Sequence, residues 1–285
     1  MFRKSTIQLL RFHFSFFLLP IYLFAISQLP AINRTNAIVV FLILHVLVYP
    51  SSNGYNSYMD RDETPIGGLK NPLQPTRELF YTTIVMDAMA IALSFFINIR
   101  FTLCILVYIL ASRAYSYRRI RLKKYPVIGF LTVFIFQGAL VFYAVFHAVQ
   151  NNWIMDTPIF PCLVSSMLIG ALYPLTQIYQ HKEDKRDGVV SISYLLGKKG
   201  TFVFSMLLFL SATFLLYIRF KQINEVNHFY WYLLIMFPVV VYFLYWMRKV
   251  WANEAAANFR NSLWMNILST ICTTTFFIII IATKH

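Results

Sequence analysis

Charge is scarce in this sequence. Asp, Glu, Lys and Arg make up 13% of the 285 residues, whereas hydrophobic residues make up 59% and the mean hydropathy is +0.61. A soluble domain has about 25% charged and about 45–50% apolar residues, so this composition excludes a soluble globular protein. Acidic residues are the rarer sign, with 11 Asp and Glu against 25 Lys and Arg, and the formal net charge is +14.

Cysteine is nearly absent as well. Cys104, Cys162 and Cys272 are odd in number, all lie inside apolar segments, and show no metal-binding spacing. These features exclude a disulfide-stapled scaffold and a cysteine-ligated metal, and favour three buried small side chains. We also find no zinc or haem signature, no nucleotide-binding glycine loop and no Ser/His/Asp set.

Long apolar runs dominate what remains. Segments of about 20 apolar residues are long enough to cross a bilayer as helices. We therefore predict an all-α, polytopic membrane protein with one domain, 1–285, and nine transmembrane helices. The expected spans are 10–30, 35–52, 77–97, 99–117, 126–149, 157–179, 200–218, 229–250 and 262–282, of which the second is at the short limit.

The basic residues alternate between the two sides of these spans. The N-terminus and the loops after spans 2, 4, 6 and 8 carry 20 of the Lys and Arg residues, and the other side carries five. The positive-inside rule then places the N-terminus in the cytoplasm and the C-terminus outside. Topology and attraction to anionic headgroups explain the net charge, so we expect no nucleic-acid partner. Arg3, Lys4 and the following apolar run also fit a secretory signal, but we expect an uncleaved first helix.

Two polar clusters follow spans 2 and 6 on the cytoplasmic side. Their side chains have the same i, i+3, i+7 spacing, which places each trio on one face of a helix. Mg²⁺ prefers such oxygen ligands and is usually bound by one or two carboxylates together with substrate phosphates. Helix capping at the interface is the alternative for either cluster alone. The trios are Asn53, Asn56, Asp60 and Gln177, Gln180, Asp184; the nearby acids Asp62, Glu63, Glu183 and Asp187 are expected in looser loop positions.

Other polar residues complete the candidate site. The basic run 118–124 on the same side can bind phosphate, because Arg makes bidentate contacts and Lys supplies a point charge. Asp87 lies about ten residues into span 3, about 15 Å deep, where an ionisable group is by default a functional candidate, as an acceptor-orienting group or a base. An interhelical hydrogen bond is the alternative for Asp87. Gln137-Gly138 in span 5 suggests close helix approach or a hydrogen bond to substrate.

Taken together, these motifs resemble the UbiA-type membrane prenyltransferases. Segment 53–60 resembles the first aspartate-rich motif of that family, and the run from Gln180 through Asp184 to 191–197 resembles the second. Segment 70–73 resembles its Asn-Arg-Pro stretch, and Tyr115-Ser116 with 121–123 resembles its Tyr-Ser…Arg-Leu-Lys element. In this chain Gly54, Asn56, Gln177 and Gln180 stand where the family has Asp, so we expect weak metal binding without diphosphate.

The resemblance implies a nine-helix bundle around a central cavity that opens into the lipid. Both trios would hold Mg²⁺, which bridges the diphosphate of a prenyl donor, and the donor would ionise to an allylic cation that a lipid-soluble acceptor captures. Asp60, Asp184 and Asp87 are the catalytic candidates; Lys70, Tyr115, Arg121 and Lys123 are the candidates for diphosphate binding.

We accordingly predict an Mg²⁺-dependent prenyltransferase. It is expected in the plasma membrane of a bacterium, with its site facing the cytoplasm. A catalytically degenerate homologue, motivated by the amide residues, and a membrane carrier of polyprenyl lipids are the alternatives. The sequence leaves the acceptor, the prenyl length and the oligomeric state open.

Overall fold

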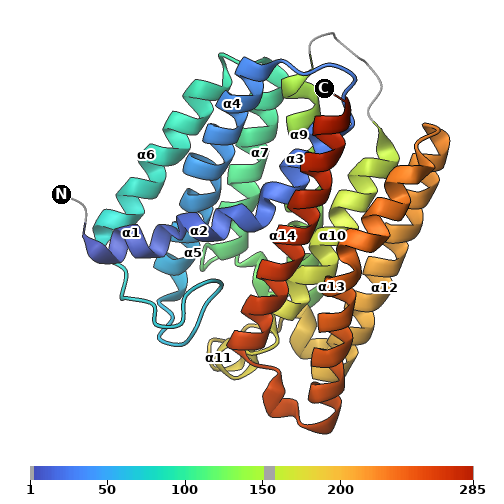
Figure 1. Ribbon diagram of the computed structural model, residues 1–285. Helices are drawn as coiled ribbons and strands as arrows, with labels where there is room; N and C mark the ends of the chain where they lie inside the picture. The colour runs from blue at the N-terminus through green and yellow to red at the C-terminus, as the bar shows by residue number, and fades with distance from the viewer. Residues whose placement is uncertain (1–2, 151–157, 285) are drawn as a thin grey trace.

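The computed structural model describes residues 3–150 and 158–284, and every regular element in these ranges is helical (Figure 1). The all-α prediction is therefore confirmed. The elements are α1 (Lys4–Leu10), α2 (Phe12–Ser15), η1 (Phe16–Leu18), α3 (Leu19–Ser27), α4 (Arg34–Leu42), η2 (Ile43–Val48), α5 (Tyr49–Asp60), α6 (Arg77–Ser94), α7 (Ile99–Ser116), η3 (Leu122–Lys124), α8 (Pro126–Val133), η4 (Phe134–Ala139), α9 (Leu140–Val149), α10 (Ile159–Gln177), α11 (His181–Arg186), α12 (Ile192–Gln222), α13 (Val226–Ala252), η5 (Glu254–Ala256) and α14 (Phe259–Lys284).

Eight helical segments in the described ranges are long and apolar enough to cross a membrane, so the chain is an integral membrane protein. Continuous segments join α1 to α3, α4 to α5 and α8 to α9 into single candidate spans. Helix α6, where the third span is predicted, is not among the eight; its 18 residues include Arg77, Glu78 and Asp87. The predicted start of the sixth span, residue 157, lies outside the described ranges.

The first and second spans both extend beyond their predicted limits. The first span begins at Lys4 rather than residue 10 and bends at Arg11, whose φ of 48° is left-handed. Accordingly, α1 and α2 run across the bundle before α3 turns into it (Figure 1). The second span continues eight residues past its predicted end at residue 52, so the first polar trio belongs to a transmembrane helix.

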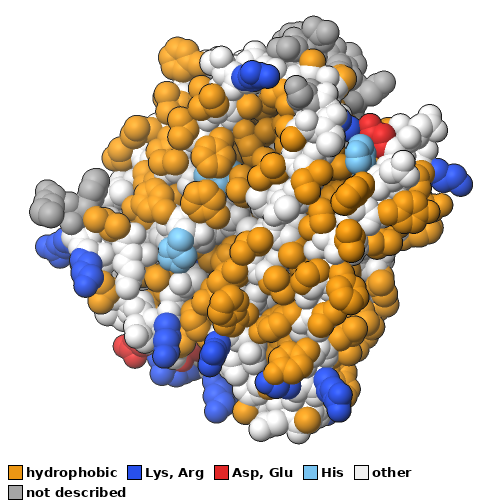
Figure 2. Space-filling model, viewed as in Figure 1, with side chains coloured by type: hydrophobic (Ala, Val, Ile, Leu, Met, Phe, Trp, Pro, Cys, Tyr) orange, Lys and Arg blue, Asp and Glu red, His pale blue; other side chains and the backbone are white. Residues whose placement is uncertain are grey.

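The outer surface is apolar around much of the molecule. Figure 2 shows hydrophobic side chains spread across the viewed face, with Lys and Arg gathered mainly at its lower end. Large apolar side chains such as Phe96, Leu234 and Phe237 are 84%, 66% and 65% exposed. Exposure on this scale is unfavourable in water but favourable against lipid chains, as expected for a membrane protein.

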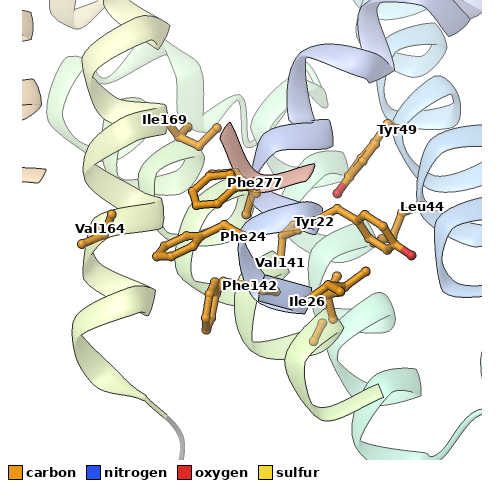
Figure 3. Packing of buried hydrophobic residues seen from close by; sticks show 14 of the residues in the cluster. Tyr22, Phe24, Ile26, Leu44, Tyr49, Val141, Phe142, Val164, Ile169 and Phe277 are labelled. Carbon is orange, nitrogen blue, oxygen red and sulfur yellow. The ribbon is translucent and has the colours of Figure 1, made fainter. Parts of the chain in front are cut away.

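Aromatic rings fill the interior between the first, fifth and last spans. Phe24 of α3 stacks on Phe277 of α14 with ring centroids 4.7 Å apart, and contacts Phe142 of α9 edge-on at 5.1 Å (Figure 3). All three side chains are fully buried. Such ring pairs contribute about 0.5–1.5 kcal/mol each beyond the burial of their area. They tie the first span to the second half of the chain.

The polar segments gather at one end of this bundle. The end of α5, the loop 61–76 and α11 lie together at the lower end in Figure 1, whereas the C-terminal end of α14 lies at the opposite end. The spans thus bring the two sequence clusters, more than 110 residues apart in the chain, to the same level.

Candidate functional site

A cavity of about 330 Å³ opens at the polar end of the bundle. Its walls come from α2, η1, α5, α7, η3, the α8–η4 segment, α10, α11, α14 and the loops after α5 and α11. All six predicted metal ligands line it, together with Tyr115 and Lys123. The structure thus brings both polar trios to a single cavity, which the sequence spacing alone did not require.

The first trio lies on one face of α5, as its spacing predicts. Asn56 is central, because its Nδ2 donates to Asp60 Oδ2 at 2.9 Å and to Ser116 Oγ of α7 at 3.0 Å. The assignment of Gly54 to a lost metal ligand is wrong. A Cβ at position 54 would meet side chains of Leu10, Leu79 and Thr83, all at 3.0 Å, so this position faces the bundle and Asn53 faces the cavity.

Asp60 is held by two cations from the α7–α8 connection. Lys123 Nζ forms an ion pair with Asp60 Oδ2, and Arg121 NH2 lies 3.5 Å from Oδ1. Arg121 is positioned by its left-handed φ of 49° and by a second ion pair with Asp187. The Asp60 side chain is only 6% exposed, and its Oδ1 is buried without a hydrogen bond in the described structure. A buried carboxylate oxygen without a hydrogen bond costs free energy, and a bound cation would offset that cost.

The second trio is not on one continuous helix. Helix α10 ends at Gln177, turn residues follow, and α11 begins at His181 with Gln180 as its N-cap. The expectation of one helical face is therefore wrong here, although all three side chains still line the cavity. Gln180 Nε2 donates to the carbonyl oxygen of Pro65 at 3.2 Å, which ties α11 to the loop that follows α5.

Gln177 continues a hydrogen-bonded chain across the cavity. Its Nε2 donates to the Tyr173 hydroxyl at 2.8 Å, and that hydroxyl bonds to the hydroxyl of Tyr115 on α7. Its Oε1, in contrast, is buried and has no hydrogen-bond partner among the described residues. Each trio therefore contains one buried side-chain oxygen without a hydrogen-bond partner, Asp60 Oδ1 in one and Gln177 Oε1 in the other.

Burial and repulsion between carboxylates raise the pKa of two acids that line this cavity, Asp184 and Asp62. Burial raises the pKa of Asp184 to about 7, and the negative charges of Asp62 and Asp60 add to this while Lys123 opposes it. Burial also raises the pKa of Asp62 to about 6, again with repulsion from Asp60. These mutual effects place three carboxyl groups in one electrostatic cluster, whose charged form requires nearby positive charge.

Asp62 and Arg11 belong to the site although the sequence analysis did not include them among its candidate residues. Asp62 and Asp187 lie in loops, as predicted, whereas Glu183 belongs to α11, and all three line the cavity. Arg61 has a left-handed φ of 55°, which turns the chain at the end of α5. The available sequence signal was the Asp-Arg-Asp spacing of residues 60–62.

Arg11 is 5% exposed and lines the same cavity. Its guanidinium donates to the carbonyl oxygens of Gly67 at 3.0 Å and Asn53 at 3.2 Å. Sequence reasoning counted Arg11 only among the charges that set topology, whereas its position inside an apolar run was the relevant signal. A guanidinium held by backbone carbonyls beside Asp62 and Asp60 is a fixed positive charge at the polar end of the cavity.

Three predicted site residues do not line the cavity. Lys70 is exposed on the loop after α5, and Arg121 contacts the site only through Asp60 and Asp187. Asp87 of α6 pairs with Arg113 of α7, with Arg113 Nε 2.9 Å from Asp87 Oδ2, and accepts a hydrogen bond from Ser51 at 2.6 Å. This network lies between α5, α6 and α7, away from the cavity lining.

The donor set fits a divalent cation that is completed by substrate oxygens. In the described structure no group of three His, Cys, Asp or Glu side chains is arranged to hold a metal by itself. Five acidic and four cationic side chains line the cavity, so it has little excess negative charge. The two buried oxygens without a hydrogen bond, Asp60 Oδ1 and Gln177 Oε1, and the facing carboxyl groups are hard ligands of the kind Mg²⁺ takes when phosphate supplies the rest.

Comparison with known proteins decides the family. The model of the UbiA prenyltransferase family matches residues 16–269, most of the chain. The chain belongs to the UbiA prenyltransferase family. This family is one of membrane enzymes, so the expected resemblance is confirmed and the chain is a prenyltransferase. No curated protein matches the sequence.

Solved structures agree with the UbiA fold. A UbiA homologue from Archaeoglobus fulgidus, bound to GPP and Mg²⁺, is 19% identical, with a TM-score of 0.71 over 98% of this chain and 100% of that one. The apo UbiA homologue from Aeropyrum pernix K1 is 17% identical, with a TM-score of 0.69 over 94% and 97%. A structure described for digeranylgeranylglyceryl phosphate synthase is 21% identical, with a TM-score of 0.64 over 98% of both chains.

Proposed function

We propose that this UbiA-family enzyme transfers a prenyl group from a prenyl diphosphate to a lipid-soluble acceptor, with Mg²⁺ at the polar end of its cavity. The observation that supports this most directly is the convergence of two oxygen-rich trios and Lys123 on one cavity. The Archaeoglobus homologue was solved with GPP and Mg²⁺, which fits the same chemistry.

Asp60, Asp62 and Asp184 would hold the cation, with the amide oxygens of Asn53, Asn56, Gln177 and Gln180 as further ligands or as acceptors for its water. When bound, Mg²⁺ neutralises charge on the diphosphate and so makes it a better leaving group. The polar side chains of the two trios would surround the diphosphate, and the apolar lining side chains would exclude water from the deeper part of the cavity. The few carboxylates explain why metal affinity here should depend on diphosphate.

Lys123 changes partner in this proposal. Without donor, its ammonium neutralises the buried Asp60. With donor bound, Asp60 would hold the cation, so Lys123 would be free to contact the diphosphate, and Tyr115 would offer a hydroxyl from α7. Cations positioned where negative charge develops are a large source of transition-state stabilisation in such reactions.

The prenyl tail would lie along an apolar wall formed by Phe17, Leu18, Ile169 and Leu172, all of which line the cavity. Ile169 lies eight residues before Gln177 on α10, which places it about 12 Å deeper at 1.5 Å per residue. The polar end therefore receives the diphosphate, and the apolar wall receives the hydrocarbon.

For the membrane arrangement, we propose that α6 crosses as a ninth span, its Asp87 neutralised by Arg113. The basic loops support a polar end on the cytoplasmic face, and the plasma membrane of a bacterium stays our expectation. The charged lining side chains lie at one end only, which suits one-sided chemistry better than a carrier with access from both faces.

A thermal-shift titration of the detergent-purified chain with geranyl diphosphate tests the donor site, because a ligand that binds the folded state raises its apparent stability. We expect a shift with geranyl diphosphate plus Mg²⁺, and little with either alone. Asp60→Ala and Asp184→Ala should each reduce this shift, whereas Glu254→Ala, at an exposed acid of η5 outside the cavity lining, should not.

Two results would count against the proposal. No shift with geranyl or farnesyl diphosphate in Mg²⁺ would favour the degenerate homologue. A shift that is equal in EDTA, or unchanged in both aspartate variants, would place the ligand elsewhere in the protein.

A further inference from the structure

Helix α11 carries part of the proposed donor site but is too short to hold its own position. It has six residues, His181–Arg186, whereas an isolated helix needs about 12–15 residues to be even marginally stable in water. Asp184 lies on this helix, and Gln180 is its N-cap. Contacts with the rest of the chain must therefore determine where these two side chains lie at the lower end of the bundle (Figure 1).

The contacts already described lead from α11 to connections between helices. Gln180 donates to the carbonyl oxygen of Pro65, in the loop after α5. Asp187, the C-cap of α11, pairs with Arg121 of the α7–α8 connection. Neither Pro65 nor Arg121 belongs to a candidate span. A direct hydrogen bond between α11 and a long transmembrane helix comes instead from the first residue of α11, His181.

His181 begins a chain of hydrogen bonds that enters α12. Its Nε2 lies 2.8 Å from Ser193 Oγ, and Ser193 Oγ lies 3.1 Å from Thr201 Oγ1. Ser193 and Thr201 are both 0% exposed, so water does not compete for these bonds. We call the hydrogen-bonded chain of His181, Ser193 and Thr201 the α11 anchor.

The α11 anchor has one consistent direction. The Thr201 hydroxyl has a single proton, which it directs to the carbonyl oxygens of Gly197 at 2.7 Å and Ser193 at 3.2 Å. Thr201 Oγ1 is then the acceptor for the Ser193 hydroxyl, and Ser193 Oγ in turn accepts from His181. The imidazole of His181 therefore donates through Nε2–H.

This chain also crosses a break in α12. Gly197 has φ 68° and ψ 171°, so the residues before it form a short helical turn that is separate from the long part of the helix. Thr201, beyond the break, bonds to the backbone on its near side at Gly197 and Ser193. His181 is thereby connected to the membrane-embedded part of α12 rather than to a loop.

The three side chains of the α11 anchor do not line the cavity. A serine with a histidine can also form a nucleophile and its base, but the Ser193 hydroxyl is fully buried and cannot reach a substrate. The anchor must therefore act through another residue. His181 and Asp184 are three positions apart on α11, which makes them neighbours on its surface. Fixing the imidazole to α12 thus fixes the backbone that carries the Asp184 carboxyl group.

We propose that His181 is a positioning residue for the donor site: the α11 anchor holds α11 so that Asp184 faces the cation and the diphosphate. This rests on the proposed prenyl transfer, in which Asp184 is a ligand of that cation. Without the anchor the carboxylate is still present, but α11 can take positions in which Asp184 does not reach the metal. More Mg²⁺ is then needed to bind the donor.

A matched pair of substitutions at His181 tests the proposal. Leucine cannot form the hydrogen bond, whereas the side-chain amide of glutamine can donate to Ser193 Oγ as Nε2–H does. The quantity is the Mg²⁺ concentration for half-maximal thermal shift with geranyl diphosphate, each variant being compared with its own ligand-free melting temperature. We expect a rise of about tenfold in His181→Leu and a return to within about twofold of the parent in His181→Gln.

Two further variants show whether the effect passes through the α11 anchor to Asp184. Ser193→Ala removes the acceptor of the His181 hydrogen bond and should reproduce the rise, with no further rise in His181→Leu/Ser193→Ala. In an Asp184→Asn background, His181→Leu should change little, whereas a general loss of structure would still weaken binding. His228→Leu is the control, because His228 pairs with Glu225 at the opposite end of the bundle, outside the cavity lining.

The outcomes separate this inference from the proposed function. If the parent shows no shift with geranyl diphosphate and Mg²⁺, the proposed function falls and the inference falls with it. If the parent binds and folded His181→Leu and Ser193→Ala need no more Mg²⁺ than His228→Leu, the inference alone is wrong. It is also wrong if His181→Gln behaves like His181→Leu, or if the full effect persists in Asp184→Asn. Should His181→Leu not fold, Ser193→Ala decides, since it removes one hydroxyl group only.

Discussion

Asn56→Asp restores a carboxylate to the first trio and tests whether positions 56 and 60 share a cation. In the ligand-free chain Asn56 Nδ2 donates to Asp60 Oδ2 at 2.9 Å. The substitution replaces this hydrogen bond with two facing carboxylates. At a charge separation of about 4 Å and an effective dielectric constant of about 20, their repulsion is about 4 kcal/mol, part of which Lys123 offsets. We therefore expect a lower melting temperature in EDTA.

Mg²⁺ should reverse that loss. A cation between the two carboxylates removes their repulsion, and relief of about 1.4 kcal/mol tightens binding tenfold. We expect the Mg²⁺ concentration for half-maximal thermal shift to fall at least tenfold in Asn56→Asp, with or without geranyl diphosphate. Asn56→Ala controls for the lost hydrogen bond, and Asn71→Asp, at an exposed loop position, controls for the added charge. An Asn56→Asp protein that is as stable as the parent in EDTA, with unchanged Mg²⁺ dependence, would refute the shared site.

Three further predictions follow from the same contacts. Donor affinity in Mg²⁺ should rise about tenfold from pH 6 to pH 8, because the pKa of Asp184 is about 7 and donor binding requires its ionised form. The stability of the ligand-free chain should fall between pH 4 and 7, because the folded chain holds this proton more tightly than the unfolded chain. Asp184→Asn should flatten both pH profiles, and an unchanged slope would contradict the assignment. Asp87→Asn should lower the free energy of unfolding by about 2–4 kcal/mol, because it leaves Arg113 unpaired. The double variant Asp87→Leu/Arg113→Met removes both charges and should lose less stability. Lost donor affinity at an unchanged melting temperature would instead place Asp87 at the site. Gly138→Ala should lower the free energy of unfolding by about 1–3 kcal/mol, because its Cβ would clash with Ser166. Gly200→Ala is the control: its Cβ would meet nothing closer than 3.4 Å, so it should be neutral or stabilising. Equal effects of the two substitutions on thermal unfolding would contradict the close approach.

Hydropathy and spacing predicted much of the fold because the bilayer imposes length and polarity on each segment. The helical face of 53–60 was predictable for the same reason, since a continuous helix carries its side chains at fixed angles. The break between Gln177 and His181 was not, because no glycine or proline in residues 178–180 announces it.

Several residues of the site take their positions from rare backbone geometry that the sequence did not predict. Arg11, Arg61 and Arg121 all adopt left-handed φ at helix ends, a conformation uncommon for arginine that nothing in the local sequence signals. Arg61 turns the chain just before Asp62, and Arg121 and Arg11 place their own guanidinium groups beside Asp60 and Asn53. Likewise, the π-helical turn Phe134–Ala139 depends on the close approach of Gly138 to Ser166 of α10, which is distant in the sequence.

A double-mutant cycle on Asp60 and Asp184 tests most directly whether the two halves of the chain build one donor site. The quantity is the dissociation constant of geranyl diphosphate in saturating Mg²⁺ for the parent, Asp60→Asn, Asp184→Asn and the double variant. If both carboxylates bind the same metal–diphosphate unit, each single change weakens binding at least tenfold, and the double change weakens it far less than the product of the two. Strictly multiplicative effects, or no effect of either change, would contradict a shared site.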